Sequence, residues 1–410
     1  MYELEWIELQ QLLGYGAQNA SKVLKSGLSV TKLINLTSDE MRKVGFTPAQ
    51  IKKAGTKALK QEAERIYKLV TDNKLRVLTY GSWEYPRTLE NIYSPPVVLY
   101  VMGDCPNFNY EIMMSVIGPR EISEYGKQAA FSLSARLALG GALVVSGGAV
   151  GGDYYAHLGA LAVGGKTLVL TGGGVLSDYL KRNDKLRNKV IKMGGALVSE
   201  FAPDYVPRFK SSFHIRNRIL AGLANAVVVI EATSKSGTLI TANIASDEGK
   251  DVYAMPGKPN LPQYEGTNNL IAQGAMPIIS ANNILEKYEG AYKKISVFSI
   301  DDIPPNELKR LYDINKEQVE KPQNQVKPKP SVKRAKTAIQ EKPQPKITSS
   351  ASGLTPTLSS VYSCITADGV YIDEIVEKTS MQTSEVLSAL TMLEIKGLVK
   401  LLPGSRYKLI

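Results

Sequence analysis

The chain has 410 residues, enough for two to four domains with large cores, and carries a formal net charge of +11. This excess favours an acidic partner without identifying one. Two cysteines and two histidines give little support to a disulfide framework, a metal site or histidine-base catalysis, and no run reaches the roughly 18 apolar residues of a membrane span. We therefore expect a cytoplasmic protein with no metal or other cofactor and no membrane association.

Short apolar stripes and turn residues over 1–72 predict a small helical module, with helical patterns at 34–44 and 48–70. The turn Gly14-Tyr15-Gly16 lies between two short helices of this module. It resembles a helix-hairpin-helix element, in which amides hold a DNA phosphate, and the module as a whole would then be SAM-like or helix-hairpin-helix-like. The alternative is that the glycines only end one helix and start another.

Strands and helices alternate from residue 112 onward. The expected helices include 124–139 and one that begins near Thr238. Short apolar runs predict strands at 113–117, 142–145, 167–170, 196–199, 226–230 and 252–255. This order predicts an α/β domain with a mostly parallel sheet and helices on both faces.

Four of these strands end in loops rich in glycine or in serine and glycine. The loops are Gly118-Pro119-Arg120, Ser146 to Asp153, Gly172-Gly173-Gly174 and Thr233 to Thr238. The carboxyl ends of parallel strands meet at one edge, and loop amides at helix N-termini suit anions. We expect a phosphate-binding rim there. Neither a P-loop nor a dinucleotide fingerprint is present.

Four basic residues are the expected cationic contacts, namely Arg120, Lys210, Arg216 and Arg218. An arginine holds a phosphate through two parallel hydrogen bonds, whereas a lysine adds a less directional charge. Arg216 and Arg218 are two residues apart, so on a helix they point in different directions. The alternative for either one is an ion pair with an acidic neighbour such as Glu231.

The other candidate contacts surround these cations. Phe213 either stacks on a base or belongs to the core. Ser236, Gly237 and Thr238 should form an amide cradle, and Asn217 either stabilises a turn or reads a base. The complete predicted DNA-binding set is Gly118, Arg120, Gly147, Gly148, Lys210, Phe213, Arg216, Asn217, Arg218, Lys235, Ser236, Gly237 and Thr238.

The composition changes after residue 300. Residues 320–347 carry eight Lys/Arg against two Glu, which fits a solvated flexible tether or, alternatively, a DNA arm. Helical patterns at 359–366, 371–378 and 384–396, followed by a hairpin with a Pro403-Gly404 turn, then predict a winged helix. Its recognition helix has no Lys or Arg, which favours a protein contact or autoregulation over DNA reading.

Six segments in this order resemble the DNA-processing protein A (DprA/Smf) family. They are GPREISEYGKQAA from Gly118, SGGAVGGDYYAHLGAL from Ser146, SEFAP from Ser199, FHIRNRILAGL from Phe213, VVVIEATSKSGTLITANIASDEGKDVYAMPG from Val227 and GTNNLIAQGA from Gly266. The resemblance implies a bacterial cytosolic protein that binds single-stranded DNA through an extended Rossmann-like fold. It also implies protection of incoming DNA, loading of the RecA recombinase in natural transformation, and a homodimer through the Rossmann domain.

One departure from the family pattern affects the rim: Pro119 stands where the family has serine, which removes one amide donor. The competing hypothesis is a Rossmann-type nucleotide hydrolase, similar to phosphoribohydrolases, with Glu231 as its carboxylate. Pro256-Gly257-Lys258 does not continue the motif of those enzymes, so we expect no enzymatic activity. We expect four parts: a helical module at 1–72, a Rossmann-like domain at 73–300, a flexible basic linker at 301–353 and a winged helix at 354–410.

Overall fold

The computed structural model describes most of the chain. The described residues are 2–104, 107–178, 183–207, 211–292, 295–297, 303–320, 356–366, 370–379, 381, 383–395, 398–402 and 406–409. The chain divides into two compact units, Met1–Val326 and Lys327–Ile410. None of the helices in the described ranges combines the length and the hydrophobicity needed to cross a membrane.

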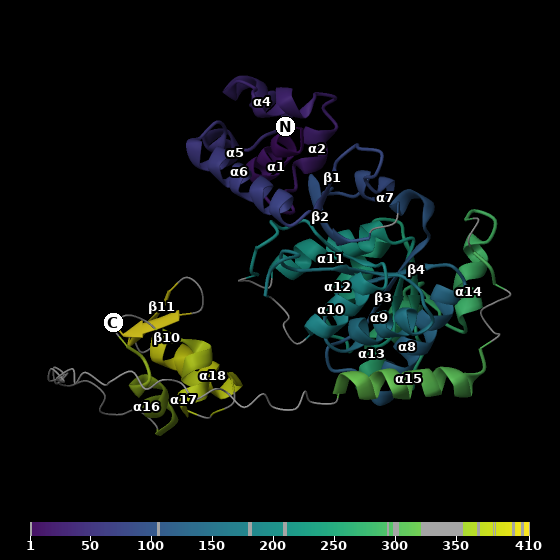
Figure 1. Cartoon of the computed structure of the whole chain (residues 1–410). Coiled ribbons are helices and arrows are strands. Elements are labelled where there is room, and N and C mark those ends of the chain that lie inside the picture. The colour runs from purple at the N-terminus through teal and green to yellow at the C-terminus, as the bar shows by residue number, and fades with distance from the viewer. Residues whose placement is uncertain are drawn as a thin grey trace, which may run out of the picture. The chain divides into compact units, whose positions relative to one another are not determined.

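The first unit begins with six helices (Figure 1). They are α1 Tyr2–Leu13, α2 Ala20–Leu24, α3 Val30–Ile34, α4 Ser38–Val44, α5 Pro48–Lys53 and α6 Lys57–Asp72. The prediction of one helix over 48–70 is wrong. Gly55 adopts a left-handed φ of +67°, and the side chain of Thr56 accepts a hydrogen bond from the Leu59 amide, so a new helix begins there.

A nine-stranded sheet follows. Its strands are β1 Arg76–Thr79, β2 Val98–Gly103, β3 Met113–Ile117, β4 Leu143–Ser146, β5 Thr167–Leu170, β6 Ala196–Ser199, β7 Ala226–Val229, β8 Asp251–Ala254 and β9 Met276–Pro277. The strands lie in the order β1-β2-β6-β5-β4-β3-β7-β8-β9, and only the pairs β1–β2 and β2–β6 are antiparallel. This confirms the predicted mostly parallel α/β sheet.

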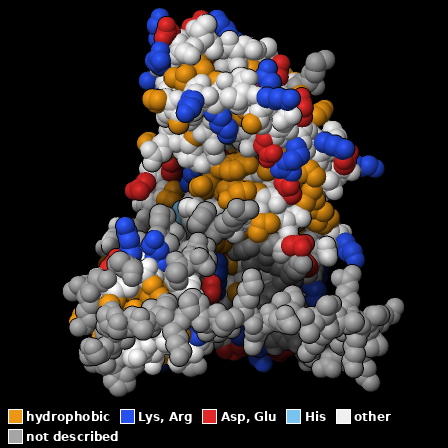
Figure 2. Space-filling model, turned by 90° about the vertical axis from the view of Figure 1, so that its left-hand side faces the viewer, with side chains coloured by type: hydrophobic (Ala, Val, Ile, Leu, Met, Phe, Trp, Pro, Cys, Tyr) orange, Lys and Arg blue, Asp and Glu red, His pale blue; other side chains and the backbone are white. Residues whose placement is uncertain are grey.

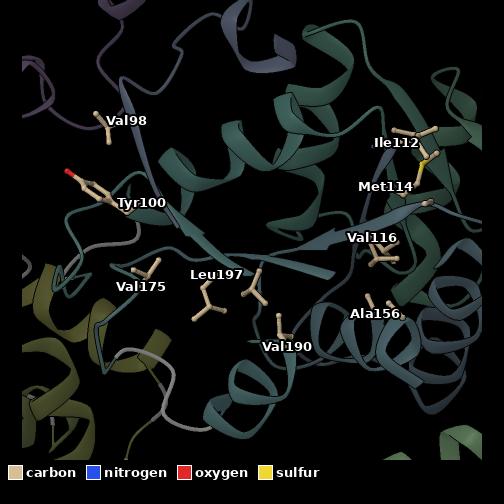
Figure 3. Close-up of a cluster of buried hydrophobic side chains, with 14 of the residues drawn as sticks. Val98, Tyr100, Ile112, Met114, Val116, Ala156, Val175, Val190 and Leu197 are labelled. Carbon is tan, nitrogen blue, oxygen red and sulfur yellow. The ribbon is translucent and has the colours of Figure 1, made fainter. Parts of the chain in front are cut away.

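Helices cover both faces of the sheet. They are α7 Arg87–Glu90, α8 Glu124–Leu139, α9 Gly152–Ala162, α10 Asp184–Lys192, α11 Ser211–Leu223, α12 Thr238–Asp247, α13 Pro262–Ala272 and α14 Ala281–Leu285. Successive side chains of a strand face opposite sides of the sheet. Met114 and Val116 belong to the core layer seen in Figure 3, and Met113 and Ile117 belong to the other layer. Burial on both faces explains the continuous apolar runs.

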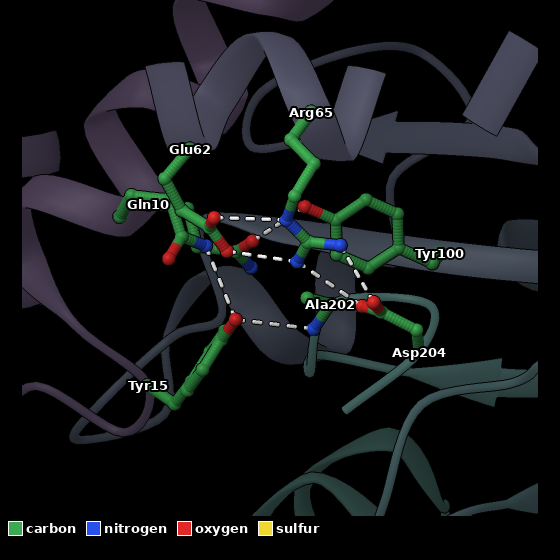
Figure 4. A network of polar contacts seen from close by, with 8 residues as sticks. Gln10, Tyr15, Glu62, Arg65, Tyr100, Ala202 and Asp204 are labelled. Carbon is green, nitrogen blue, oxygen red and sulfur yellow. Dashed lines mark hydrogen bonds and ion pairs between the residues drawn. The ribbon is translucent and has the colours of Figure 1, made fainter. Parts of the chain in front are cut away.

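A buried glutamine joins the N-terminal helices to the sheet. The side-chain amide of Gln10 donates to the carbonyl oxygens of Val98 and Glu200, at 3.0 Å each, and its oxygen accepts from the Tyr100 hydroxyl at 2.8 Å. At the more exposed edge of the same contact, Arg65 pairs with Glu62 and Asp204 (Figure 4). Because buried polar groups need partners, the Gln10 network fixes how α1 lies against β2 and β6.

Residues 305–320 form a helix, α15 Pro305–Glu320, so the predicted flexible linker is wrong over this range. Leu308 and Tyr312 are both 2 % exposed and lie four residues apart, on one face of the helix. The ring of Tyr312 packs on those of Phe131 and Tyr155, at centroid distances of 5.4 and 5.8 Å. The remaining linker range, 321–353, lies outside the described residues.

The second unit is the predicted winged helix. It contains α16 Pro356–Ser363, α17 Ile372–Thr379, α18 Thr383–Ile395 and a sheet in the order β10-β12-β11, with β10 Val370–Tyr371, β11 Val399–Leu402 and β12 Arg406–Leu409. On α18, Leu387 and Met392 are exposed. The predicted turn Pro403-Gly404 lies outside the described residues, and the domain boundaries at 72, 300 and 353 stay predictions.

The Gln10 network gives a stability prediction. Gln10→Ala should lower the free energy of unfolding by about 1–3 kcal/mol, because the Tyr100 hydroxyl and two carbonyl oxygens lose a buried partner. Urea denaturation of the full chain followed by circular dichroism measures the change. Lys68→Ala, at an exposed position of α6, is the control and should behave as wild type. Equal stability of both variants would contradict this role of Gln10.

Candidate nucleic-acid interface

The four glycine-rich loops follow strands β5, β4, β3 and β7, which are neighbours in this order. Since these strands are parallel, their carboxyl ends share one edge. Helices α8, α9 and α12 begin at that edge, after the loops. The structure thus assembles the loops into one rim, as the sequence predicted, and their helix N-termini give it a positive electrostatic bias.

A pocket of about 430 Å³ opens in the rim. The predicted site residues that line it are Gly118, Arg120, Phe213, Arg216, Asn217, Ser236, Gly237 and Thr238. Sequence reasoning missed three of its polar residues, which are Asp153, His214 and Thr241. Gly147, Gly148, Arg218 and Lys235 do not line the pocket, and Lys210 lies outside the described residues.

Arg120 is the exposed cation of this pocket. Its guanidinium lies over the ring of Phe213, 5.5 Å from the centroid. Among the described residues no carboxylate forms an ion pair with Arg120. Phe213 is half-buried, with its ring edge against Gly172. The pair therefore offers both a cation and an aromatic ring at the mouth of the pocket.

Arg216 has a different position because its side chain lies beneath the rim. The residue is 8 % exposed, and its Nη1 donates to the Leu170 carbonyl at 2.5 Å. Its Nε donates to the side-chain oxygen of Asn217 at 2.9 Å. A Cβ on Gly147 would lie 2.1 Å from Nη1, so only glycine lets this loop pass over the guanidinium. Arg216 supports the loops from below, Asn217 orients it, and Gly147 makes room for it.

Asp153 is the carboxylate that sequence reasoning missed at this site. It is buried at the start of α9, and its Oδ2 accepts from the Ala149 amide at 3.4 Å. Burial raises the pKa of Asp153 above its usual value, while Arg216 and the amides of Ala149 and Gly118 oppose that shift. The carboxyl group of Asp153 thus already uses the Gly118 amide. The signal available in the sequence was an acidic residue directly after Gly151-Gly152.

Arg218 points away from the pocket. Its Nη2 donates to both carboxylate oxygens of Glu200 at 2.6 Å, and Glu200 also accepts from the Gly16 amide at 3.1 Å. The ion pair that was the alternative for Arg218 is therefore present, with Glu200 rather than Glu231 as the acidic neighbour. We do not keep Arg218 among the proposed DNA contacts. Because Glu200 takes the Gly16 amide, the structure favours the interpretation that Gly14-Tyr15-Gly16 only separates two helices.

In the loop before α12, two of the three amides predicted to hold an anion already donate hydrogen bonds within the loop. The Ser236 amide donates to the Thr233 carbonyl at 3.0 Å, and the Thr238 amide donates to the Ser236 hydroxyl at 3.2 Å. Among the described residues no acceptor lies against the Gly237 amide. The predicted three-amide cradle is thereby reduced to the Gly237 amide and nearby hydroxyl groups, with exposed Lys235 beside them.

The fold and its rim define the class as Rossmann-like α/β proteins with an anion-suited strand edge. The family model of DNA recombination-mediator protein A matches residues 76–289, and that of the DprA winged helix domain matches residues 343–405. The chain belongs to this DprA/Smf family.

Named relatives agree with this assignment. Protein Smf of Synechocystis is 32% identical over 334 residues, which span 81% of this chain and 79% of the relative. DNA processing protein DprA of Bacillus subtilis is 34% identical over 261 residues, 62% of this chain and 86% of the relative. The X-ray structure of DprA from Streptococcus pneumoniae is 30% identical, covers 69% of this chain and 98% of its own, and has a TM-score of 0.58.

Two glycines of the rim give a matched pair of variants. Gly147→Ala should lower the free energy of unfolding by about 1–3 kcal/mol, because the new methyl group displaces a buried guanidinium. A Cβ at Gly237 meets nothing within 4 Å and its φ is −60°, so Gly237→Ala should keep the stability or raise it by about 0.4–1 kcal/mol. Thermal unfolding compares the two, and equal melting temperatures would contradict the proposed packing.

Proposed function

We propose that the rim binds single-stranded DNA in DNA processing during natural transformation. The observation that carries the proposal is the exposed guanidinium of Arg120 over the half-buried ring of Phe213, at the mouth of the pocket and beside the start of α12. A phosphate would bind Arg120 and the Gly237 amide, and a base would stack against Phe213. A stack on a side chain needs an unpaired base, which favours a single strand over a duplex.

Two further predicted contacts belong to this proposal. Lys235 is exposed in the loop before α12 and adds charge without directional bonds. Lys210 remains a proposed contact because it is a basic residue three positions before Phe213. Gly118, Gly147, Gly148, Arg216 and Asn217 act indirectly, because they shape the rim.

We infer two partners and a location from family membership. The family description, a DNA recombination mediator, supports loading of the RecA recombinase onto the bound strand in the cytoplasm. A homodimer through the Rossmann-like domain is supported by a groove of about 530 Å³ between α8 and the start of α14. Its side chains Tyr125 and Ile279 are 60% and 81% exposed, an apolar surface that a second copy would cover.

The geometry of Glu231 supports a protein without hydrolase activity. This carboxylate is 0% exposed, accepts from the Ser123 amide at 3.0 Å and from the Tyr264 hydroxyl at 3.1 Å, and also bonds the Ser123 hydroxyl. It is absent from the residues that line the pocket. Glu231 therefore holds the start of α8 rather than facing a bound nucleotide.

Fluorescence anisotropy of the full chain with labelled oligonucleotides tests the strand preference. Single-stranded DNA of any sequence should bind more tightly than duplex DNA, and the affinity should fall as salt rises because bound phosphates release counterions. Tighter duplex binding would contradict the proposal. Release of a free base from a nucleotide, without strand binding, would support the hydrolase instead.

Arg120 is the residue to change in the same assay. Arg120→Ala should weaken single-strand binding by roughly 10- to 150-fold, the loss of a hydrogen bond to a charged group of about 1.5–3 kcal/mol. Arg42→Ala is the control, since Arg42 is an exposed arginine on α4 that pairs with Asp39. It should bind as wild type, with the same melting temperature. Equal losses in both variants would indicate non-specific charge effects and contradict the site.

A further inference from the structure

A second pocket, of about 320 Å³, lies on the other side of Arg120. The first pocket opens toward α11 and α12, whereas this one opens toward the starts of α8 and α9. The side chains that give it chemical character are Arg120, Lys127, Tyr154, Tyr155 and Asn183. Its volume falls within the range of about 300–1,000 Å³ typical of small-ligand pockets.

The walls of the second pocket are held in place by contacts behind them. Tyr155 is 7% exposed, and its ring packs on Tyr312 of α15 at 5.8 Å, with the ammonium of Lys127 5.8 Å from its centroid. Tyr154 is the more exposed of the two neighbouring rings, and they meet edge to face at 5.4 Å. Asn183 is 3% exposed, and its Nδ2 donates to the Gly148 carbonyl at 2.7 Å. These contacts preorganise the aromatic rings and the amide that line this pocket.

Both cations and carboxylates surround the second pocket, and the cations are more numerous. Glu124, on α8 behind the pocket, accepts from Lys316 at 2.7 Å, from Tyr312 at 2.8 Å and from Lys127 at 3.1 Å. Two cations therefore share this one carboxylate. Glu121 lines the pocket as well and would repel a phosphate placed inside it. Arg120, between the two pockets, remains the place where an anion is favoured.

We propose that the second pocket holds the base of the nucleotide next to the one in the first pocket, with the phosphate between them on Arg120. This inference rests on the proposed single-strand binding. The shared Arg120 joins the pockets, so one phosphate contact serves both. The aromatic wall and the amide of Asn183 suit a heterocyclic base, whereas Glu121 disfavours a second phosphate. The base stacks against Tyr154, the more exposed ring.

The second pocket depends on contacts that helix α15 makes with the residues around it. Its residues 305–320 lie outside both ranges that the family models match, 76–289 and 343–405. Nevertheless Tyr312 of α15 supports Tyr155, and Lys316 holds Glu124. The second base site is thus completed by a helix outside the matched domains.

Oligothymidylates of about 4–16 nucleotides, the range of site sizes for single-strand binding folds, test the proposal with the full chain. Each carries 2-aminopurine at one of two neighbouring positions, and its quenching reports stacking. Wild type should quench both positions. Tyr154→Ala should weaken binding by about 5- to 150-fold, the loss of one stacked base, and should abolish quenching at one position only. Tyr154→Phe, which keeps the ring, should bind and quench as wild type, and Phe213→Ala should lose the other position.

The outcomes separate this inference from the function on which it rests. If wild type binds no single strand, the proposed function fails. If Phe213→Ala weakens binding but Tyr154→Ala keeps wild-type affinity and quenching, the second base site is overturned while the function stands. An equal loss in Tyr154→Phe would also overturn base stacking on this ring. The two-position quenching of wild type is independent of any variant's folding, and quenching at a single position would contradict the proposal.

Discussion

The rim depends on one buried cation, Arg216. Its guanidinium binds the carbonyl at the end of β5, passes beneath Gly147 after β4 and lies near Asp153 at the start of α9. A buried charge without partners would be strongly destabilising, so these loops are held together by the groups that satisfy it. Burial, and secondarily Arg216, lower the pKa of His157 to about 3, so this histidine stays neutral below the rim. Asp153 is the carboxyl group that lies near this interior positive charge.

The arginines near the rim therefore have two roles. Some are held by partners inside the protein, and Arg120 is exposed to a ligand. Arg216 and Arg218 leave α11 in different directions, one beneath the rim and the other to Glu200 at the contact with the N-terminal helices. Helix α11 therefore links the rim to the helical module, and Arg120 keeps its charge exposed. Figure 2 shows Lys and Arg side chains spread over the N-terminal helices with Asp and Glu among them, rather than gathered in one stripe. The exposed guanidinium of Arg120 at the rim is the feature on which the proposed anion site rests.

The sheet was predictable because its strands are buried on both faces. Continuous apolar runs between glycines predicted 113–117, 167–170 and 196–199 with the bounds that the structure has. Parallel pairing then placed the loops on one edge. The amino-acid composition predicted a flexible linker where the structure has helix α15, because a few spaced residues are enough to pack a helix. Leu308 and Tyr312 anchor α15 within a range poor in aromatic residues.

The position of the candidate site could be predicted from the sequence, whereas the contacts of its side chains could not. Loop positions follow from the order of strands, but the partner of a long side chain depends on which way it leaves its helix. The pairing of Arg218 with Glu200 and the position of Arg216 beneath Gly147 depend on such directions. Likewise, Asp153 uses amides that the glycine pattern alone assigned to a ligand. In this rim, internal partners compete with the ligand for the same donors.

A crystal structure of the full chain with a bound oligothymidylate would show where the strand contacts the rim. A phosphate should lie within hydrogen-bond distance of the Arg120 guanidinium and the Gly237 amide, with a base against Phe213. A strand bound elsewhere, with Arg120 still over an uncovered Phe213 ring, would contradict the proposed site.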